Sequence, residues 1–356
     1  MAFCPKRNSL NSLRLILATV VAIAHVGAIA YGNQPRIGVT DVGALAVDAF
    51  FVLSGFLITS SFLRLGSVGR YLWHRALRIL PAFWCVLLLI SFGVAPLLAL
   101  LEGRPPSSVF TGDNPSWLFA LNNIFLMMRQ FDVAGLPTGT DNPQVVNGAL
   151  WTLYFEFVCY VLVVVLGVMR ILARRGLVVA LTALSGLALG LQELGWAPDI
   201  ADLYLRFVFM FLLGVLGHLY ADRLVIRGNY ALLAASVTLV SLLLFTDYRP
   251  AGGAAFAYLC LWAAVSTPWL APGPTTDLSY GMYIYHWPII TLLTTAGVAA
   301  ALPMWAFGTL ALLLSAGVAF CSWRLVERPA LGWKDAALPG LSRRRRPGRV
   351  APLPNS

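Results

Sequence analysis

Long apolar segments recur along almost the whole chain, and they constrain the fold more than any other feature. A helix that crosses the hydrocarbon core of a bilayer needs about 20 mainly apolar residues. About ten segments approach or exceed this length: residues 13–31, 42–63, 77–101, 148–169, 177–192, 203–221, 230–246, 253–270, 279–300 and 303–323. Residues 117–128 form a shorter apolar stretch, typical of a half-helix or an interfacial segment. We therefore predict an all-α integral membrane protein with about ten transmembrane helices.

The composition agrees with a membrane protein and excludes an ordinary soluble domain. Hydrophobic residues make up 59% of the chain and charged residues 11%, against about half and a quarter in soluble domains. The net charge of +10 fits the arginine-rich inner loops of membrane proteins, so we expect the lipid bilayer, and no nucleic acid, as the partner of these charges. The five cysteines show no paired spacing, so we expect neither a disulfide framework nor a metal site.

The arginines predict the orientation of the chain. With the N-terminus inside, the inner loops and the C-terminal tail hold most of them, and the outer loops keep Arg36, Arg104, Arg129 and Arg249. This asymmetry predicts that both termini are cytoplasmic. We expect residues 1–328 to form one membrane domain in the inner (cytoplasmic) membrane of the cell, followed by a basic, disordered cytoplasmic tail over residues 329–356.

One outer loop is much longer than the others. Residues 102–147, between the third and fourth predicted spans, are rich in Pro, Gly, Asn and Asp. Loops of this length are usually either functional or disordered. Both interpretations stay open: a lid or acceptor site, or a segment whose middle is disordered.

His25 is the first ionisable residue inside a predicted span. It follows Arg14 by eleven residues, which corresponds to a rise of roughly 16 Å along one helix. Arg14 would lie at the cytoplasmic boundary and His25 beyond the bilayer centre. An imidazole accepts a proton near neutral pH, as a general base must. The alternative is a histidine that only hydrogen-bonds a neighbouring helix.

Two carboxylates lie in other predicted spans. Asp48 stands in the apolar run VDAFFVLSGFL, where it needs a histidine or arginine partner; a structural ion pair is the competing interpretation. Glu156 and Tyr160 are four residues apart and therefore share one helix face. A buried carboxylate beside a phenol can orient a histidine or bind an acceptor hydroxyl.

Arg75 and Arg78 also share a helix face, at the cytoplasmic entrance of the third span. Their planar guanidinium groups suit phosphate oxygens, although simple anchoring to the inner membrane surface would give the same pattern. Further along, His286 lies in the aromatic run YGMYIYHWP, and Glu327 precedes Arg328 and Pro329 at the end of the tenth segment. The alternative interpretations are an interfacial aromatic belt for the first motif and a helix terminus for the second.

Together these motifs resemble the acyltransferase-3 family of membrane O-acyltransferases, and they cover nearly the whole chain. The matching pieces are Arg14-x10-His25, VDAFFVLSGFLI (47–58), Arg75-x-x-Arg78, the 151–160 segment with Glu156, SYGMYIYHWP (279–288) and Glu327-Arg328-Pro329. One departure is Leu153-Tyr154-Phe155-Glu156, where many relatives have a small polar residue at the second or third position.

The resemblance implies a bacterial-type enzyme that moves an acetyl or other short acyl group from cytoplasmic acyl-CoA, acetyl-CoA first of all, to a sugar hydroxyl. The acceptor would be an exported or cell-surface glycan, a glycolipid or a related glycoside. His25 would be the catalytic residue with Arg14 essential beside it, and Arg75 and Arg78 would bind the coenzyme. Direct attack on the thioester and an acyl-histidine relay both remain open.

We further expect Asp48 or Glu156 to hold the catalytic imidazole in the correct tautomer, and Trp151, Tyr160 and His286 to contact substrate. A transporter or flippase of a lipid-linked glycan is the main alternative, although it predicts inverted repeats and interrupted helices that are not evident in the sequence. A non-catalytic partner in a polysaccharide-export complex is a third possibility.

Overall fold

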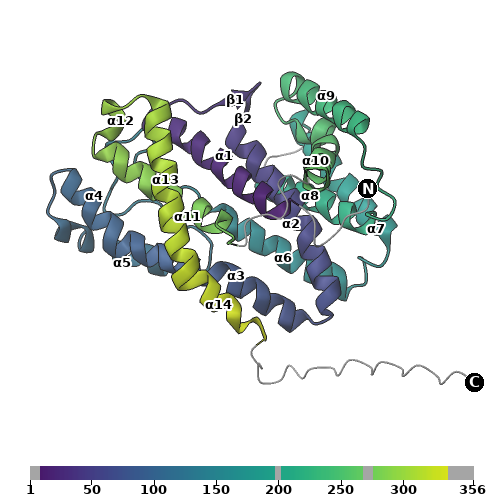
Figure 1. Ribbon diagram of the computed structural model, residues 1–356, viewed down its shortest axis with the longest axis horizontal. Helices are drawn as coiled ribbons and strands as arrows, with labels where there is room; N and C mark the ends of the chain where they lie inside the picture. The colour runs from purple at the N-terminus through teal and green to yellow at the C-terminus, as the bar shows by residue number, and fades with distance from the viewer. Residues whose placement is uncertain (1–8, 197–201, 268–275, 336–356) are drawn as a thin grey trace, which may run out of the picture.

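The computed structural model describes residues 9–196, 202–267 and 276–335, and most of these residues are helical (Figure 1). The long helices are α1 Leu10–Ala30, α2 Val42–Leu65, α3 Val68–Leu89, α6 Thr152–Val168, α7 Arg175–Glu193, α8 Asp202–Leu219, α9 Gly228–Leu244, α10 Arg249–Ser266, α11 Ser279–Thr295 and α13 Met304–Ser322. The only strands among the described residues are the short antiparallel pair β1 Arg36–Ile37 and β2 Thr40–Asp41.

Each predicted apolar segment coincides with one of these helices. Six of the described helices are long and apolar enough to cross a membrane, and α6 and α9 are shorter apolar helices. The all-α, multi-pass membrane class is therefore confirmed. The last three residues of the predicted segment 253–270 lie outside the described residues.

The largest difference in boundaries is at the third segment, which begins at Val68 and not at residue 77. Ser67 caps this helix by accepting a hydrogen bond from the backbone N–H of Arg70, and the first turns are too rich in charged residues to register as an apolar run. At its far end α3 continues through a π-helical turn, η1 Ile90–Val94, into α4 Ala95–Leu101. The last long helix is extended in the same way: α13 continues through the π-helical turn η5 Trp323–Glu327 into α14 Arg328–Gly332.

The centre of the molecule is formed by α1, which packs against α2 on one side and α11 on the other, while α2 also packs along α8 (Figure 1). Glycines allow the α2–α8 contact to be close. A Cβ atom at Gly55 would lie 2.1 Å from the backbone oxygen of Phe211, and one at Gly214 would lie 2.0 Å from that of Val52. Such close helix approach at small residues is typical of membrane proteins.

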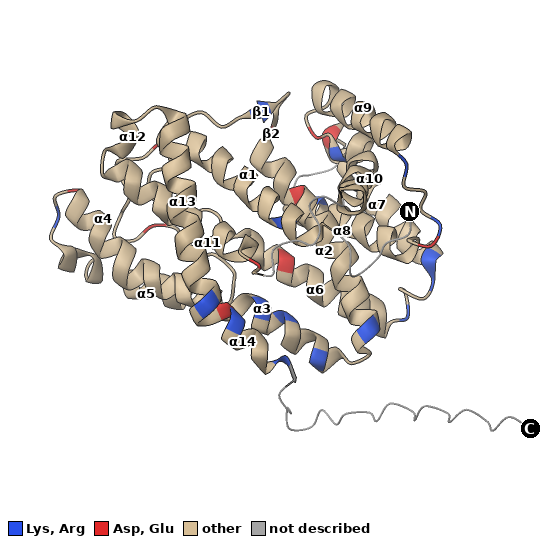
Figure 2. Cartoon of the chain, viewed as in Figure 1, with Lys and Arg blue, Asp and Glu red and all other residues tan. Residues whose placement is uncertain are grey.

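Charged residues are sparse on the helices and gather in particular places (Figure 2). Lysine and arginine lie along α3, near α14 and at the connection between α7 and the preceding helix, whereas most of the helical surface carries neither charge. Large apolar side chains cover the periphery instead; Leu232, Leu244 and Leu313 are 72%, 72% and 67% exposed. An apolar periphery of this kind is suited to lipid.

The long loop 102–147 is folded, which favours the functional interpretation over the disordered one. It contains η2 Pro106–Phe110, a 3₁₀ turn, and α5 Ser116–Asn122, a short helix that covers the first half of the apolar stretch 117–128. In its middle, Gln130 donates to the backbone oxygens of Asn114 and Asp132.

The chain after α13 begins as ordered structure. Helix α14 is followed by the 3₁₀ turn η6 Trp333–Asp335, and the Trp73 indole donates to the backbone oxygen of Trp333 over 3.1 Å. The remainder of the predicted disordered tail, residues 336–356, lies outside the described residues.

Candidate active site

His25 on α1 and His286 on α11 form a hydrogen-bonded pair, which we call the histidine pair. Nδ1 of His25 lies 2.7 Å from Nε2 of His286. The ring planes are within 10° of each other with centroids 5.0 Å apart, so the rings meet edge to edge along the N···N line. His286 is fully buried, and the Trp287 indole packs against His25 with centroids 4.6 Å apart at an interplanar angle of 66°.

The position of α11 beside His25 depends on a proline and on the long loop. Pro288 has no backbone N–H, so the Ile284 carbonyl four residues earlier loses its helical partner. The fully buried Asn147 donates its side-chain amide to that carbonyl over 2.9 Å. One residue before Pro288, the Trp287 indole donates to the backbone oxygen of Val145. The end of the loop thus fixes the helix turn that carries His286.

A pocket lies between α1, α2, α6 and α11; we call it the central pocket. The empty space in it is about 490 Å³, part of which is open to solvent. It is lined by Arg14, Val47, Phe50, Phe51, Ser54, Thr152, Leu153, Glu156, Ser279, Tyr280 and Tyr283. The Tyr283 hydroxyl is hydrogen-bonded to that of Thr152 over 2.6 Å, and its ring centroid lies 6.1 Å from that of His286. Tyr283 therefore links the pocket wall to the histidine pair.

Arg14 and Arg78 converge on Asp277, a residue that belongs to none of the sequence motifs. The Asp277 carboxylate accepts from Nη2 of Arg78 at 2.5 Å and from Nη1 of Arg14 at 3.2 Å. Its other oxygen accepts from the hydroxyl and backbone N–H of Ser279. Burial raises the pKa of Asp277, but the charges of Arg14 and Arg78 and the Ser279 hydrogen bonds lower it further, to well below its usual range.

This Asp277 clamp joins α1 and α3 to the segment that enters α11. An aspartate two residues before a serine that begins a helix is the signal that could have found it. Glu327 lies at the edge of the same cluster: it is 3% exposed, with Oε2 4.0 Å from Nη1 of Arg78.

Arg75 has different surroundings from Arg78. Its guanidinium carbon lies 5.8 Å from the centroid of the Tyr160 ring, and the Tyr160 hydroxyl donates to Glu156 over 2.5 Å. Nε of Arg75 is buried without a hydrogen-bond partner among the described residues. A buried donor without a partner is costly, so the structure leaves at least this donor open to a ligand.

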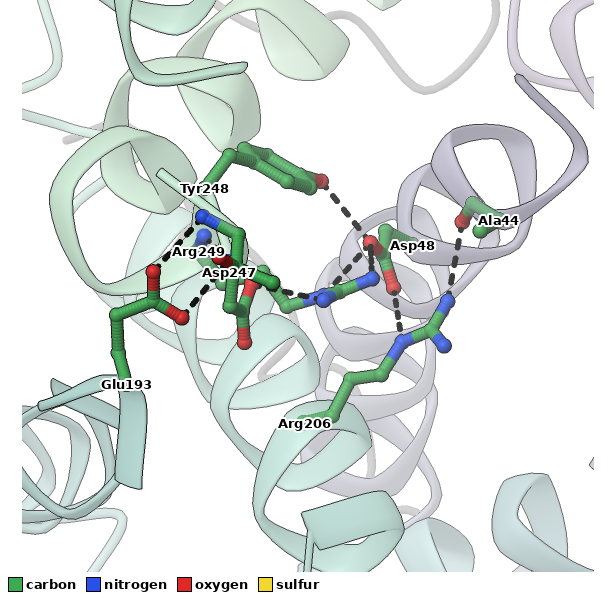
Figure 3. A network of polar contacts seen from close by, with 8 residues as sticks. Ala44, Asp48, Glu193, Arg206, Asp247, Tyr248 and Arg249 are labelled. Atoms are coloured by element: carbon green, nitrogen blue, oxygen red, sulfur yellow. Dashed lines mark hydrogen bonds and ion pairs between the residues drawn. The ribbon is translucent and has the colours of Figure 1, made fainter. Parts of the chain in front are cut away.

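Asp48 belongs to a separate buried network (Figure 3). Its carboxylate accepts from Nε of Arg206 at 3.1 Å, from the Tyr248 hydroxyl at 3.0 Å and from Nη2 of Arg249 at 2.8 Å. Arg249 also pairs with Asp247 at 2.8 Å. The network ties α2 to α8 and to the start of α10, which corresponds to the structural ion pair that the sequence left as an alternative. Arg206, within an apolar segment, was the overlooked signal.

The predicted site residues are thus only partly brought together. The expectation that Asp48 or Glu156 orients His25 receives no support from the geometry. Among the described residues, Asp48 accepts hydrogen bonds from Arg206, Tyr248 and Arg249. Glu156 accepts one from Tyr160. His25 is instead hydrogen-bonded to His286. Histidines 261 residues apart share no local sequence signal that would have paired them.

Of the residues predicted to contact substrate, none lines the central pocket. Tyr160 contacts the pocket residue Glu156, and His286 contacts the pocket residue Tyr283, but neither lines the pocket itself. Trp151 lines an apolar cleft with Phe131, Tyr154, Tyr204 and neighbouring residues.

Comparison with known proteins gives a consistent family. Residues 7–324 match the model of the acyltransferase domain family. "Nodulation protein 10" of Rhizobium leguminosarum bv. viciae is 28% identical over 91% of this chain and 93% of its own. The "O-acetyl transferase" of Shigella phage Sf6 is 26% identical over 91% and 96%, respectively.

A third relative, the "Putative peptidoglycan O-acetyltransferase YrhL" of Bacillus subtilis (strain 168), is 29% identical over 81% of this chain and 50% of its own. No solved structure gives a significant match. The sequence motifs, the helical membrane architecture and the match over nearly the whole chain lead to one conclusion: this protein belongs to the acyltransferase-3 family of membrane O-acyltransferases.

Proposed function

We propose that this enzyme transfers an acetyl or other short acyl group from cytoplasmic acyl-CoA to a sugar hydroxyl of an exported or cell-surface glycan, glycolipid or related glycoside. The observation that carries this proposal is the arrangement along α1. Arg14 lines the central pocket, and His25, eleven residues further along, pairs with the buried His286 next to that pocket. A cation and a base are thus held roughly 16 Å apart on one rigid helix.

The proposal includes the topology. We infer ten transmembrane helices with both termini in the cytoplasm and the protein in the inner membrane. This orientation places the arginines of α3 at the inner face, where the donor is available, and the long loop outside, where the acceptor is. The distribution of arginine supports it.

The donor would bind by its phosphates near Arg75, Arg78 and Arg14. The buried Nε of Arg75 has no hydrogen-bond partner among the described residues, which fits an anionic ligand. Asp277 holds Arg14 and Arg78 in fixed positions, so these two side chains are already oriented before any ligand arrives. Fixed donors lose less conformational entropy on binding than mobile ones. The acyl arm would then extend through the central pocket toward His25.

In the transfer step, Nε2 of His25 removes the proton of the acceptor hydroxyl while the hydroxyl oxygen attacks the thioester carbonyl. The new C–O bond forms, the C–S bond breaks, and the departing thiolate takes the proton from His25. In the relay variant, His25 first becomes acylated and then passes the group to the acceptor. Acylated protein that accumulates when acceptor is absent would identify the relay.

The test compares surface glycans and glycolipids by mass spectrometry from cells that carry wild-type protein, His25→Ala, His218→Ala or no protein. We expect His25→Ala and the null strain to lose the mass of one acyl group per modified unit. His218→Ala is the control, since this histidine lies on α8 against Phe56, outside the central pocket. If His25→Ala keeps full acylation, the proposed catalytic role is wrong. If the null strain differs in the amount or location of the glycan while His25→Ala behaves as the wild type, a transporter is the better description.

A further inference from the structure

We infer that His286 is a positioning residue that fixes the tautomer of His25, in the place where many hydrolases and transferases use a carboxylate. The inference rests on the proposed function, because it assigns a role within the proposed reaction. It follows from two hydrogen bonds and from the donor and acceptor properties of imidazole.

The first hydrogen bond fixes the proton of His286. Its Nδ1 lies 3.1 Å from the backbone oxygen of Met282. A carbonyl oxygen can only accept, so Nδ1 of His286 must carry a hydrogen. A neutral imidazole has a single N–H, and Nε2 of His286 is therefore an acceptor.

The second hydrogen bond transmits this choice to His25. Nε2 of His286 accepts, so Nδ1 of His25, 2.7 Å away, must donate. The neutral His25 ring then has its lone pair on Nε2, the nitrogen that can take a proton from a hydroxyl group. When Nε2 is protonated, Nδ1 still donates to His286, so the same hydrogen bond serves both protonation states of His25.

This arrangement has the logic of the carboxylate in a Ser-His-Asp triad, which holds the histidine in its useful tautomer. The difference is that His286 is uncharged when it accepts. A neutral partner avoids burying an unpaired carboxylate in an apolar environment, which would be costly. The two carboxylates predicted for this role are held elsewhere: Asp48 by arginines and Glu156 by the Tyr160 hydroxyl.

His286 is fixed well enough to serve as an orienting group. Its side chain is fully buried, and the Tyr283 ring packs against it with an interplanar angle of 62°. The neighbouring turn is held by the hydrogen bonds from Asn147 to Ile284 and from Trp287 to Val145. A ring that cannot turn presents one nitrogen to His25 at all times.

The first test compares His286→Gln with His286→Leu in purified protein. The Gln side chain can place an acceptor oxygen near the position of Nε2, whereas Leu fills the space without an acceptor. We expect kcat to fall by roughly 10²–10⁴-fold in His286→Leu, the range of a lost general-base contribution, and by much less in His286→Gln, which keeps an acceptor for Nδ1 of His25. KM for acyl-CoA should stay within about threefold in both, since the lost interaction acts mainly in the transition state.

The second test measures the tautomer without using activity. The chain has four histidines, so ¹⁵N-histidine NMR in bilayers can follow His25, with His74→Gln, His218→Gln and the two His286 variants to assign the other three signals. We expect protonated Nδ1 and unprotonated Nε2 in the wild type and in His286→Gln, and a mixture of tautomers in His286→Leu.

Three outcomes would overturn the inference: unchanged kcat in His286→Leu, equal loss in both variants, or loss in His286→Leu with an unchanged His25 tautomer. The third would mean that His286 only supports packing. Failure of the proposed function is distinguishable, because it would appear as absent acyl transfer in the wild type while the NMR result still stands.

Discussion

Arg78 on α3 and Asp277, just before α11, lie 2.5 Å apart between Nη2 and Oδ2, and Arg14 on α1 shares the same carboxylate oxygen. One carboxylate therefore holds two of the arginines that the family motifs contribute. This contact joins α1, α3 and the segment that enters α11 at the Arg14 end of the central pocket.

Asp277→Ala should therefore affect both folding and donor binding. Removing one partner of a buried ion pair costs about 3–5 kcal/mol, and we expect less, about 1–3 kcal/mol, because the three side chains are 13–23% exposed. KM for acyl-CoA should rise as Arg14 and Arg78 lose their orientation. Thermal unfolding in detergent and initial rates measure the two effects; an Asp277→Ala protein with wild-type KM would contradict the orienting role.

The Asp277 clamp should also show a defined pH dependence. The pKa of Asp277 is depressed in the folded protein, so its stabilisation is present above the unfolded pKa and is lost as pH falls through the lower folded pKa. The difference in stability between wild type and Asp277→Asn should be constant from about pH 8 to pH 5 and shrink only below about pH 4. Unfolding midpoints across this range check it, and a difference that vanishes near pH 6 would argue against the assignment.

Arg75→Ala should act mainly on the donor. Its Nε has no hydrogen-bond partner within the described residues, so its loss removes a ligand contact more than a structural one. We expect KM for acyl-CoA to rise by roughly 10–100-fold with kcat changed by less than about threefold, the pattern of a lost ground-state contact. Arg64→Ala, at the exposed end of α2, is the matched control. A large fall in kcat at saturating donor would show that Arg75 has another role.

Asp48→Ala should destabilise the fold without a direct effect on chemistry. It would leave Arg206 and Arg249 without their shared carboxylate (Figure 3), at a cost of about 3–5 kcal/mol. The yield of monodisperse protein should fall, while kcat per folded molecule stays near that of the wild type. Size-exclusion chromatography followed by rate measurements on the folded fraction separates the two. A stable Asp48→Ala protein without activity would contradict this prediction and indicate that Asp48 has a role in catalysis.

Asn147→Asp tests how the long loop supports α11. The change keeps the shape but replaces the amide donor with an acceptor facing the Ile284 carbonyl. We expect a loss of about 1–3 kcal/mol in stability, the cost of an unsatisfied buried group, and a lower kcat, since the adjacent turn carries His286. Unfolding temperature and initial rate measure these effects. Wild-type values for both would show that the Pro288 turn needs no support from the loop.

Much of this molecule follows from local sequence. The apolar segments predicted the helices because a bilayer span needs a continuous apolar run, and this requirement is visible in one dimension. The beginning of α3 was predicted too late because an apolar run was the criterion. The first turns of α3 carry His74, Arg75 and Arg78 and are not apolar. The family motifs predicted an O-acyltransferase, and the comparisons confirm it.

The sequence by itself thus determined the class of fold, the family and the chemical groups available, because these depend on residue type and short spacing. Only the tertiary structure decided which groups meet. His25 pairs with His286, Arg14 with Asp277, and Asp48 with Arg206 and Arg249, across separations of 158 to 263 residues. Such partners are selected by helix packing, in which each buried polar group takes the nearest complementary group. That packing is fixed by the whole set of helices, and no single motif contains it.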